Sequence, residues 1–265
     1  MSMLVVGSLA FDTIETPHGR KEDVLGGSAT HFSYSASYLT DVALVGVVGK
    51  DFPEEHIKLY ESKGIDTSGV ERSSGDTFNW TGRYVGDMNE AETLEVNLNV
   101  LANFEPKLSD AHLQRKWVFL ANGDPVTQLS VANQMKKATF IVADTMNLWI
   151  ATKKHDLEKL FKTINGVVMN DGEARMFTGE ETIVAAARKM LSFGLDLIII
   201  KKGEHGALAM TPDYTVVLPA YPTERVIDPT GAGDAFAGGT FGYLALCDEL
   251  SPGTLRKALR YGTIC

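Results

Sequence analysis

Cysteine is scarce in this sequence, which contains two among its 265 residues, Cys247 and Cys265. So few thiols form neither a disulfide framework nor a metal-binding spacing, and we expect both to be reduced thiols of a cytoplasmic protein. Uncharged apolar runs long enough to span a membrane are missing, and no basic leader with an apolar core opens the sequence. We therefore expect neither a membrane span nor a signal peptide.

Basic residues are also in short supply, since 25 Lys and Arg face 34 Asp and Glu, for a formal charge of −9. Nucleic acids and anionic membranes are bound by basic surfaces, so we expect neither of them as a partner. A nucleotide stays open, because local backbone N–H groups and one or two cations are enough to hold phosphate.

Several well-known site motifs are missing as well. The sequence has no Gly-x-x-x-x-Gly-Lys-Ser/Thr, no protein-kinase His-Arg-Asp or Asp-Phe-Gly, and no His-Glu-x-x-His. These absences argue against a P-loop enzyme, a protein kinase and a zinc protease of that type. A nicotinamide-dependent oxidoreductase is disfavoured too, because no Gly-x-Gly-x-x-Gly follows the first apolar run.

Short aliphatic runs separated by segments of helical periodicity make up most of the sequence. Runs of this kind, rich in β-branched residues and without alternation, are typical of parallel strands buried on both faces. We therefore predict a doubly wound, mostly parallel α/β sheet flanked by helices, in a single domain over residues 1–265. The predicted strands are Leu4–Val6, Val42–Val48, Trp117–Leu120, Phe140–Val142, Gly166–Met169 and Leu197–Ile200, and the predicted helices are His31–Leu39, Glu54–Lys63, Val126–Lys136, Glu180–Phe193 and Ala235–Leu246.

Two stretches alternate instead with a period of two. Phe78, Trp80 and Tyr84 share one face of the first stretch, and the second stretch, residues 94–100, alternates in the same way. This period predicts antiparallel strands with one buried face. We expect a small antiparallel β lid over about residues 11–24 and 74–102, rather than a decorative hairpin. An aromatic face of this kind covers either a substrate or a second subunit, so a homodimer through the lid is a further possibility.

The segment Asp228–Asp234 reads Asp-Pro-Thr-Gly-Ala-Gly-Asp and follows a strand that we expect to end near Val226-Ile227. Gly231 and Gly233 allow a tight turn that exposes successive N–H groups, and a helix that starts here directs its positive end at the same place. Such a site stabilises a phosphoryl group in transfer, while Asp234 in the first helical turn can accept a proton from an attacking hydroxyl. A glycine-rich turn with a first-turn helix charge is the simpler alternative.

The segment closely resembles the C-terminal signature of the ribokinase-like (PfkB-type) carbohydrate kinases. The resemblance implies that ATP, Mg²⁺ and K⁺ are the cofactors. It also implies that Asp234 is the catalytic base, that the amides of Gly231, Ala232 and Gly233 form the anion hole, and that Asp228 and Thr230 bind the monovalent cation.

Resemblance at the N-terminal end concerns the phosphate acceptor. Gly7-Ser8 followed by Asp12 resembles the family's first strand and its substrate-binding aspartate, and Gly26-Gly27 resembles its hinge. Alone, Asp12 reads as a turn cap, but a carboxylate outside the carboxyl end of a strand is where open α/β sheets bind ligands. The resemblance implies that Asp12, Gly26, Gly27, His31 and Asp234 bind the substrate. His31 and Ala10 stand where asparagine is common in the family, which argues against ribose itself as the substrate. A histidine at such a place is more often a half-buried structural residue than a ligand, so we do not expect His31 to be catalytic.

Two further segments resemble the parts of the family that bind the nucleotide. Asn170-Asp-Gly-Glu173 resembles the family's Asn-x-x-Glu motif, which implies contact with magnesium through water, whereas alone it reads as a helix capping box. Residues 200–206 resemble the strand and turn beside the nucleotide, although Lys201 and Lys202 alone read as surface charge. The implied nucleotide-binding residues are Asn170, Glu173, Lys202, Gly203, Gly206, Gly231 and Gly233.

Three functions remain open at this point. The first is transfer of the ATP γ-phosphoryl group to a hydroxyl, expected to be a hydroxymethyl group, of a small sugar. The second is the same reaction on a nucleoside. The third is a non-catalytic regulator that binds a sugar or nucleoside on the same fold, against which the intact Asp234 argues. Members of the family usually continue for some tens of residues beyond the position of Cys265, so we expect either a trimmed chain or an open adenine site that binds nucleotide loosely.

Overall fold

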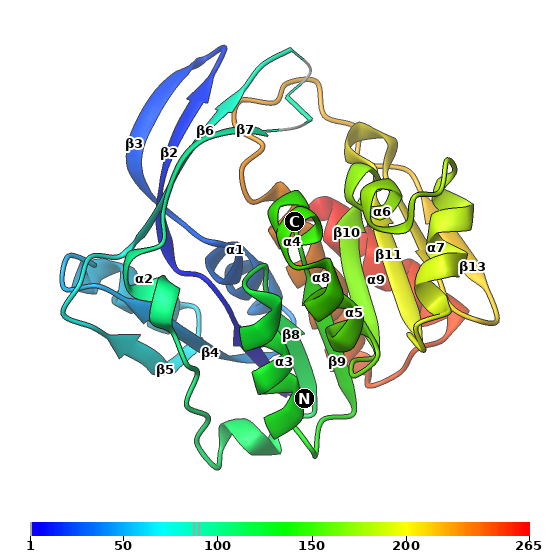
Figure 1. Cartoon of the computed structure of the whole chain (residues 1–265), viewed down its shortest axis with the longest axis horizontal. Coiled ribbons are helices and arrows are strands. Elements are labelled where there is room, and N and C mark those ends of the chain that lie inside the picture. The colour runs from blue at the N-terminus through cyan, green and yellow to red at the C-terminus, as the bar shows by residue number, and fades with distance from the viewer. Residues whose placement is uncertain (1, 87, 90) are drawn as a thin grey trace.

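The computed structural model describes residues 2–86, 88–89 and 91–265. A large sheet of nine strands, in the order β13-β12-β11-β10-β9-β8-β1-β4-β5, runs through the molecule (Figure 1). The strands from β5 to β11 pair in parallel, and β12 and β13 add an antiparallel edge. Their bounds are β1 Ser2–Val6, β4 Asp41–Val48, β5 Asp66–Arg72, β8 Trp117–Leu120, β9 Phe140–Asp144, β10 Gly166–Asn170, β11 Leu197–Lys201, β12 Ala207–Met210 and β13 Thr215–Leu218.

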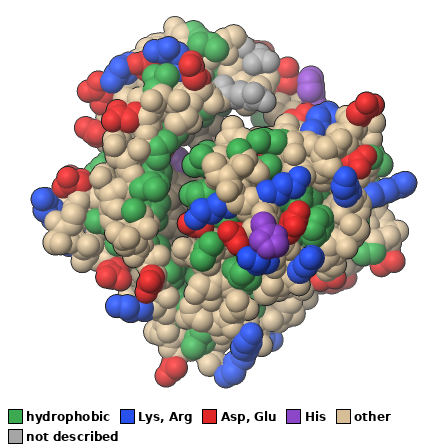
Figure 2. All heavy atoms as spheres, viewed as in Figure 1, with side chains coloured by type: hydrophobic (Ala, Val, Ile, Leu, Met, Phe, Trp, Pro, Cys, Tyr) green, Lys and Arg blue, Asp and Glu red, His purple; other side chains and the backbone are tan. Residues whose placement is uncertain are grey.

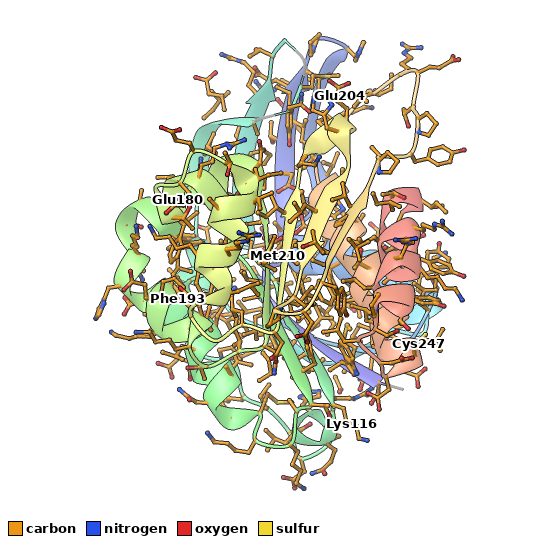
Figure 3. All side chains as sticks on the ribbon, turned by 90° about the vertical axis from the view of Figure 1, so that its right-hand side faces the viewer. Lys116, Glu180, Phe193, Glu204, Met210 and Cys247 are labelled. Carbon is orange, nitrogen blue, oxygen red and sulfur yellow. The ribbon has the colours of Figure 1, made fainter. Side chains whose placement is uncertain are left out.

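Helices cover both faces of this sheet, as the non-alternating strands predict (Figure 3). On β1, Met3 and Val5 pack into one hydrophobic core, whereas Leu4 and Val6 pack into the other. The first core is closed by α1 Ser28–Ala36, α2 Glu54–Ser62, α8 Ala232–Cys247 and α9 Pro252–Ile264, and the second by α3 Pro125–Gln134, α4 Asn147–Thr152, α5 Lys154–Phe161, α6 Asp171–Thr178 and α7 Ile183–Leu191.

The glycines inside α8 let it pack closely against α1. A Cβ atom at Gly238 would lie 2.4 Å from the carbonyl oxygen of Phe32, and one at Gly242 would lie 3.2 Å from the Cα of Ala36. Each interior glycine costs a helix roughly 1 kcal/mol relative to alanine, and this contact offsets that cost. The close approach fixes the start of α8, and with it Asp234, relative to the first strand and helix.

A second sheet, in the order β3-β2-β6-β7, projects from the end of the large one (Figure 1). Its strands are β2 Ala10–Thr16, β3 Gly19–Gly26, β6 Phe78–Tyr84 and β7 Ala91–Asn97. The pairs β2–β3 and β6–β7 are antiparallel, and β2–β6 is parallel. We call this sheet the lid. The alternating run at residues 94–100 was predicted to be one strand, but β7 ends at Asn97 and residues 99–103 form a 3-10 turn.

The predicted burial of one face of β7 is wrong. Leu94 and Val96 are both exposed, and every residue of β7, the edge strand of the lid, is exposed. Val96 instead borders an open pocket, which is described below.

One further prediction about secondary structure is wrong, and one predicted helix begins later than expected. No strand ends near Val226-Ile227: both side chains are exposed, the backbone from Pro219 to Thr230 is irregular, and Pro229 has no N–H to donate to a ladder. The helix predicted for Glu180–Phe193 begins at Ile183, because the Thr182 hydroxyl accepts a hydrogen bond from the amide of Ala185 and caps the helix there. Within the described residues, no helix combines the length and apolar character needed to cross a membrane.

Candidate active site

Polar residues collect at the carboxyl ends of the central parallel strands, beneath the lid. Asp144, Asn170 and Lys201 are the last residues of β9, β10 and β11, and the register places Asn170 opposite Lys201. Glu204, in the turn after β11, lies at the end of the sheet that the lid covers (Figure 3). Ligands of open α/β sheets bind at this edge, so the candidate site lies there.

Asp12 is buried on β2 of the lid and contacts the turn that starts α1. A Cβ atom at Gly26 would lie 2.0 Å from the Asp12 carboxylate, so only a glycine admits that carboxylate. Gly27, with a φ of 96°, caps α1 and donates its amide to Asp12. Burial raises the pKa of Asp12 to about 7, against the hydrogen bond from Gly27, and the charge of Asp228 adds to the rise. The structure therefore brings together Asp12, Gly26 and Gly27, which the sequence predicts to bind the phosphate acceptor.

The Asp228–Asp234 segment forms the turn into α8, and Gly231 is its N-cap with a φ of 74°. The first helical backbone bond joins Ala235 N to Gly231 O at 2.8 Å, so the amide of Gly233 stands before it and is available to an anion. The Ala232 amide donates to Pro229 O at 3.1 Å and closes the turn. Thr230 N donates to Asp228 Oδ1 at 2.9 Å, which orders the residues predicted to hold a monovalent cation.

The imidazole ring of His31 packs against this turn. A Cβ atom at Gly231 would lie 2.4 Å from the imidazole ring, so the turn rests directly on the histidine. Burial lowers the pKa of His31, against the charge of Asp228, and this favours a neutral ring. Nε2 of His31 is buried and has no partner within the described part of the chain. His31 belongs to α1, so its ring joins that helix to residues 228–234, which we call the anion loop.

Asp234 lies in the first turn of α8, where the helix end favours an anion. Burial raises the pKa of Asp234 to about 8, Asp144 adds to the rise, and Lys201 opposes it. Asp12 and Glu173 contribute further to the rise. A carboxyl group with a pKa in this range can take a proton near neutral pH, which suits a general base.

Asn170 and Glu173 form a complete capping box at the start of α6. Glu173 N donates to Asn170 Oδ1 and Asn170 N donates to Glu173 Oε2, both at 2.7 Å. Glu173 also lies close enough to Asp234 and Lys201 to influence the pKa values of both, so the capping box borders the candidate site.

The turn after β11 contains three further residues predicted to bind the nucleotide, Lys202, Gly203 and Gly206. Lys202 N donates to Gly206 O at 2.8 Å and closes the turn, in which Gly203 and Gly206 both have positive φ. The Lys202 side chain is half-buried beside this turn.

Sequence reasoning missed Lys201. Its ammonium group donates to Asp144 Oδ2 at 3.2 Å, with the Lys201 side chain 20% exposed and the Asp144 side chain 4% exposed. Burial alone would lower the pKa of Lys201, but the carboxylates of Asp144, Glu173 and Asp234 raise it, so the ammonium stays charged. The alternation of side chains along a strand, which we call strand parity, could have identified it. Lys201 lies two residues after Ile199, which faces α8, so both side chains point to the same face of the sheet.

The lid contacts both ends of the site. The Thr230 hydroxyl donates to Tyr84 Oη at 3.3 Å, which joins β6 to the anion loop. A Cβ atom at Gly203 would lie 2.6 Å from Asn89 Oδ1, so the tip of the lid lies on the turn after β11. In Figure 1 the loop between β13 and α8 passes along the same part of the lid. Tyr84 and Asn89 were not predicted as site residues, because their partners are far away in sequence.

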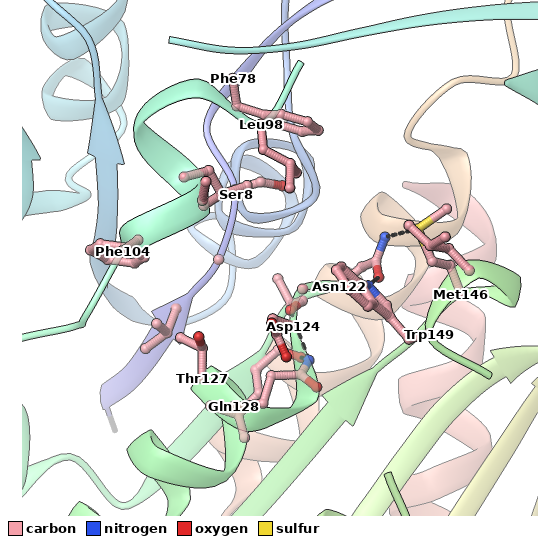
Figure 4. Close-up of a pocket in the computed structure, with 18 of the residues that line it drawn as sticks. Ser8, Phe78, Leu98, Phe104, Asn122, Asp124, Thr127, Gln128, Met146 and Trp149 are labelled. Carbon is pink, nitrogen blue, oxygen red and sulfur yellow. Dashed lines mark hydrogen bonds between the residues drawn. The ribbon is translucent and has the colours of Figure 1, made fainter. Parts of the chain in front are cut away.

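An apolar pocket lies between the lid and the ends of β1 and β8 (Figure 4). Hydrophobic side chains border the hollow between the lid and the rest of the molecule in Figure 2. Phe78 and Leu98 reach into the pocket from the lid side, opposite Asn122 and Trp149 (Figure 4). Asn122 Oδ1 accepts from Trp149 Nε1 at 3.2 Å, which fixes the indole edge. Other lining residues are Ser8, Trp80, Val96, Gln128, Met146 and Leu148.

Acidic side chains are spread around the site. Among the described residues, no group of three or more His, Cys, Asp or Glu is placed to hold a metal ion. Phosphate oxygens, water and carboxylates are the ligands that a hard divalent ion prefers, and Glu173 is a carboxylate at this edge of the sheet.

Known proteins resemble this chain along nearly its whole length. The model of the pfkB family of carbohydrate kinases matches residues 2–265. A cytidine kinase from Thermococcus kodakarensis is 30% identical over 244 residues, which cover 90% of this chain and 87% of that protein. The crystal structure of a nucleoside kinase from Methanocaldococcus jannaschii, an archaeal member of the ribokinase family, has a TM-score of 0.78 at 20% identity and covers 99% of this chain and 89% of that one. A fructokinase from Vibrio cholerae, solved with fructose, ADP and calcium, has a TM-score of 0.80 at 19% identity and covers 100% of this chain and 91% of that one.

Proposed function

The chain belongs to the PfkB family of carbohydrate kinases and is a phosphotransferase, and we propose that it transfers the γ-phosphoryl group of ATP to a hydroxymethyl group, with Asp234 as the base. The observation that carries the proposal is the position of Asp234 in the first turn of α8, next to the available amide of Gly233. A base and an anion site at one helix start are the two groups that phosphoryl transfer to an alcohol needs.

The reaction divides among the residues of this chain. Asp234 removes the proton of the acceptor hydroxyl as the new O–P bond forms and the bond to the ADP oxygen breaks. The amide of Gly233 at the start of α8 binds an oxygen of the transferred group, and Asp12 accepts a hydrogen bond from another hydroxyl of the acceptor. Bound magnesium would neutralise phosphate charge, with Glu173 as its protein contact through water.

For the acceptor we propose a nucleoside rather than a bare sugar. The pocket places aromatic and aliphatic side chains beside the turn of Gly26 and Gly27. Ser8 lines the pocket and accepts a hydrogen bond from the amide of Ser28, the residue after Gly27. On the lid, the register pairs Asp12 with Trp80, which also lines the pocket. A ribose bound by Asp12 would then place an attached flat base among Trp80, Leu98 and Trp149. The cytidine kinase relative supports this choice.

The test is ATP-dependent phosphorylation of a panel of nucleosides, pentoses and hexoses, with ADP release as the measured quantity. We expect nucleosides to be used with kcat/KM at least tenfold above that of the matching free sugar, because the base adds buried apolar contact. Comparable values for ribose and its nucleosides would refute the nucleoside assignment. Tight binding of an acceptor without ADP release in the presence of ATP and magnesium would instead support the regulator.

A further inference from the structure

Lys201 occupies a place that the mechanism above does not explain. The side chains of Phe140, Val142 and Ile199 pack into the core that α8 closes, and side chains alternate along a strand. Asp144 and Lys201 continue this alternation at the ends of β9 and β11, so both project toward α8. The pair therefore lies between the sheet and the start of the helix that carries Asp234.

The ammonium group of Lys201 lies against the anion loop itself. A Cβ atom at Gly233 would lie 3.0 Å from Lys201 Nζ and 3.6 Å from its Cδ and Cε atoms. The positive end of α8 and the ammonium, which Asp144 holds at 3.2 Å, thus converge on one point, and both attract an anion there. The arrangement favours an anion at that point, in contact with both groups.

A purely structural ion pair does not account for this arrangement. A buried pair adds little net stability over an apolar pair of similar volume, because both charges lose their water. Asp144 is also oriented on its other side, since Oδ1 accepts from Thr145 N at 2.8 Å. Its Oδ2 is therefore directed at Lys201 and holds the ammonium in one position.

We infer that Lys201 is a catalytic residue whose ammonium binds the terminal phosphate of ATP and follows the phosphoryl group during transfer, and that Asp144 is the positioning residue that holds it beside Gly233. The inference rests on the proposed kinase function. The ammonium donates a hydrogen bond to a non-bridging oxygen while the bond from phosphorus to the ADP oxygen breaks. The acceptor proton goes to Asp234, so Lys201 gains and loses no proton.

The first test is nucleotide binding, which needs no acceptor. Calorimetry would compare the non-hydrolysable β,γ-imido analogue of ATP with AMP, both with magnesium. We expect Lys201→Met to weaken the analogue by about 10- to 100-fold and AMP by less than threefold, because only the analogue has a terminal phosphate. Lys159→Met, which removes a lysine from an exposed pair with Asp156, is the matched control and is expected to leave both affinities unchanged. Equal losses for the two nucleotides in Lys201→Met would overturn the inference.

The second test separates the positioning role of Asp144 from folding. Lys201→Met leaves the buried Asp144 carboxylate without its partner, so the double variant Asp144→Asn/Lys201→Met is included to keep the pair neutral. We expect the double variant to fold and to show the same selective loss for the imido analogue. Asp144→Asn alone should lower kcat by about tenfold or more, with the KM of the acceptor within threefold of wild type. A double variant that folds and retains wild-type affinity for the analogue would overturn the assignment.

The two proposals fail separately. If the wild-type protein binds the imido analogue in a Lys201-dependent way but phosphorylates no acceptor, the kinase assignment fails and the phosphate site stands. If the wild-type protein phosphorylates nucleosides and Lys201→Met does so at the same kcat, the inference alone fails.

Discussion

Replacing Asp234 with asparagine should make the protein more stable while it removes most of the activity. Burial and neighbouring charges raise the pKa of Asp234 from 3.8 to about 8. The folded state therefore binds a proton more tightly than the unfolded state, and this group's contribution to stability falls as the pH rises from about 4 to about 8. At pH 7 this group lowers the free energy of unfolding. The pH lies roughly 3 units above the unfolded-state pKa, which corresponds to about 4 kcal/mol at 1.36 kcal/mol per unit.

The expected gain is smaller than this ceiling. Asp234 keeps part of its surface exposed, so water screens its charge, and an asparagine amide in the same place also loses water. We expect Asp234→Asn to gain about 1–3 kcal/mol at pH 7, which raises Tm by roughly 3–10 °C. Since both folded and unfolded forms of the aspartate are protonated at low pH, the gain should shrink as the pH falls toward 5.

Thermal unfolding without ligands, at pH 5, 6 and 7, measures this gain, and ADP release at saturating substrates measures the loss of activity. Loss of the base should lower kcat by about 10²–10⁴-fold. Asp156→Asn, the same change in the first turn of α5, is the control and should show neither the gain nor the loss. An Asp234→Asn protein that is less stable than wild type at pH 7, or one that keeps its kcat, would refute the assigned environment or role of this residue.

Three further changes test the lid and the pocket. Trp149→Ala should raise the KM for a nucleoside by about tenfold or more and leave that for ATP within threefold, as steady-state kinetics with each substrate varied would show. Tyr84→Phe removes the hydrogen bond between the lid and Thr230 and should raise the acceptor KM by about 3- to 10-fold, whereas an unchanged KM would mean that this contact does not hold the lid. Gly82→Ala should displace the Trp80 indole, because a Cβ atom there would lie 1.9 Å from the ring, and a loss of nucleoside binding with intact binding of the ATP analogue would bear this out.

The sequence predicted those parts of the fold and site that depend on local pattern. Buried parallel strands contain unbroken aliphatic runs, so most of the large sheet was found, and the Asn170 capping box is encoded within four residues. The expected strand near Val226-Ile227 failed because two β-branched residues mark a strand only when a sheet edge is available to pair with them, and here none pairs. Contacts such as that of Tyr84 with Thr230 join residues far apart in sequence, and no local pattern encodes them.

Strand parity explains why Lys201 projects toward α8 and Asp234. In the pair Lys201-Lys202 the sequence shows two equivalent charges, but the last residue of β11 must follow Ile199 toward α8. Once there, it lies among Asp144, Glu173 and Asp234, which keep it charged despite burial. Because Lys201 also opposes the rise in the pKa of Asp234, one ammonium group serves both ends of the reaction: it favours the terminal phosphate and keeps the base closer to its ionised form.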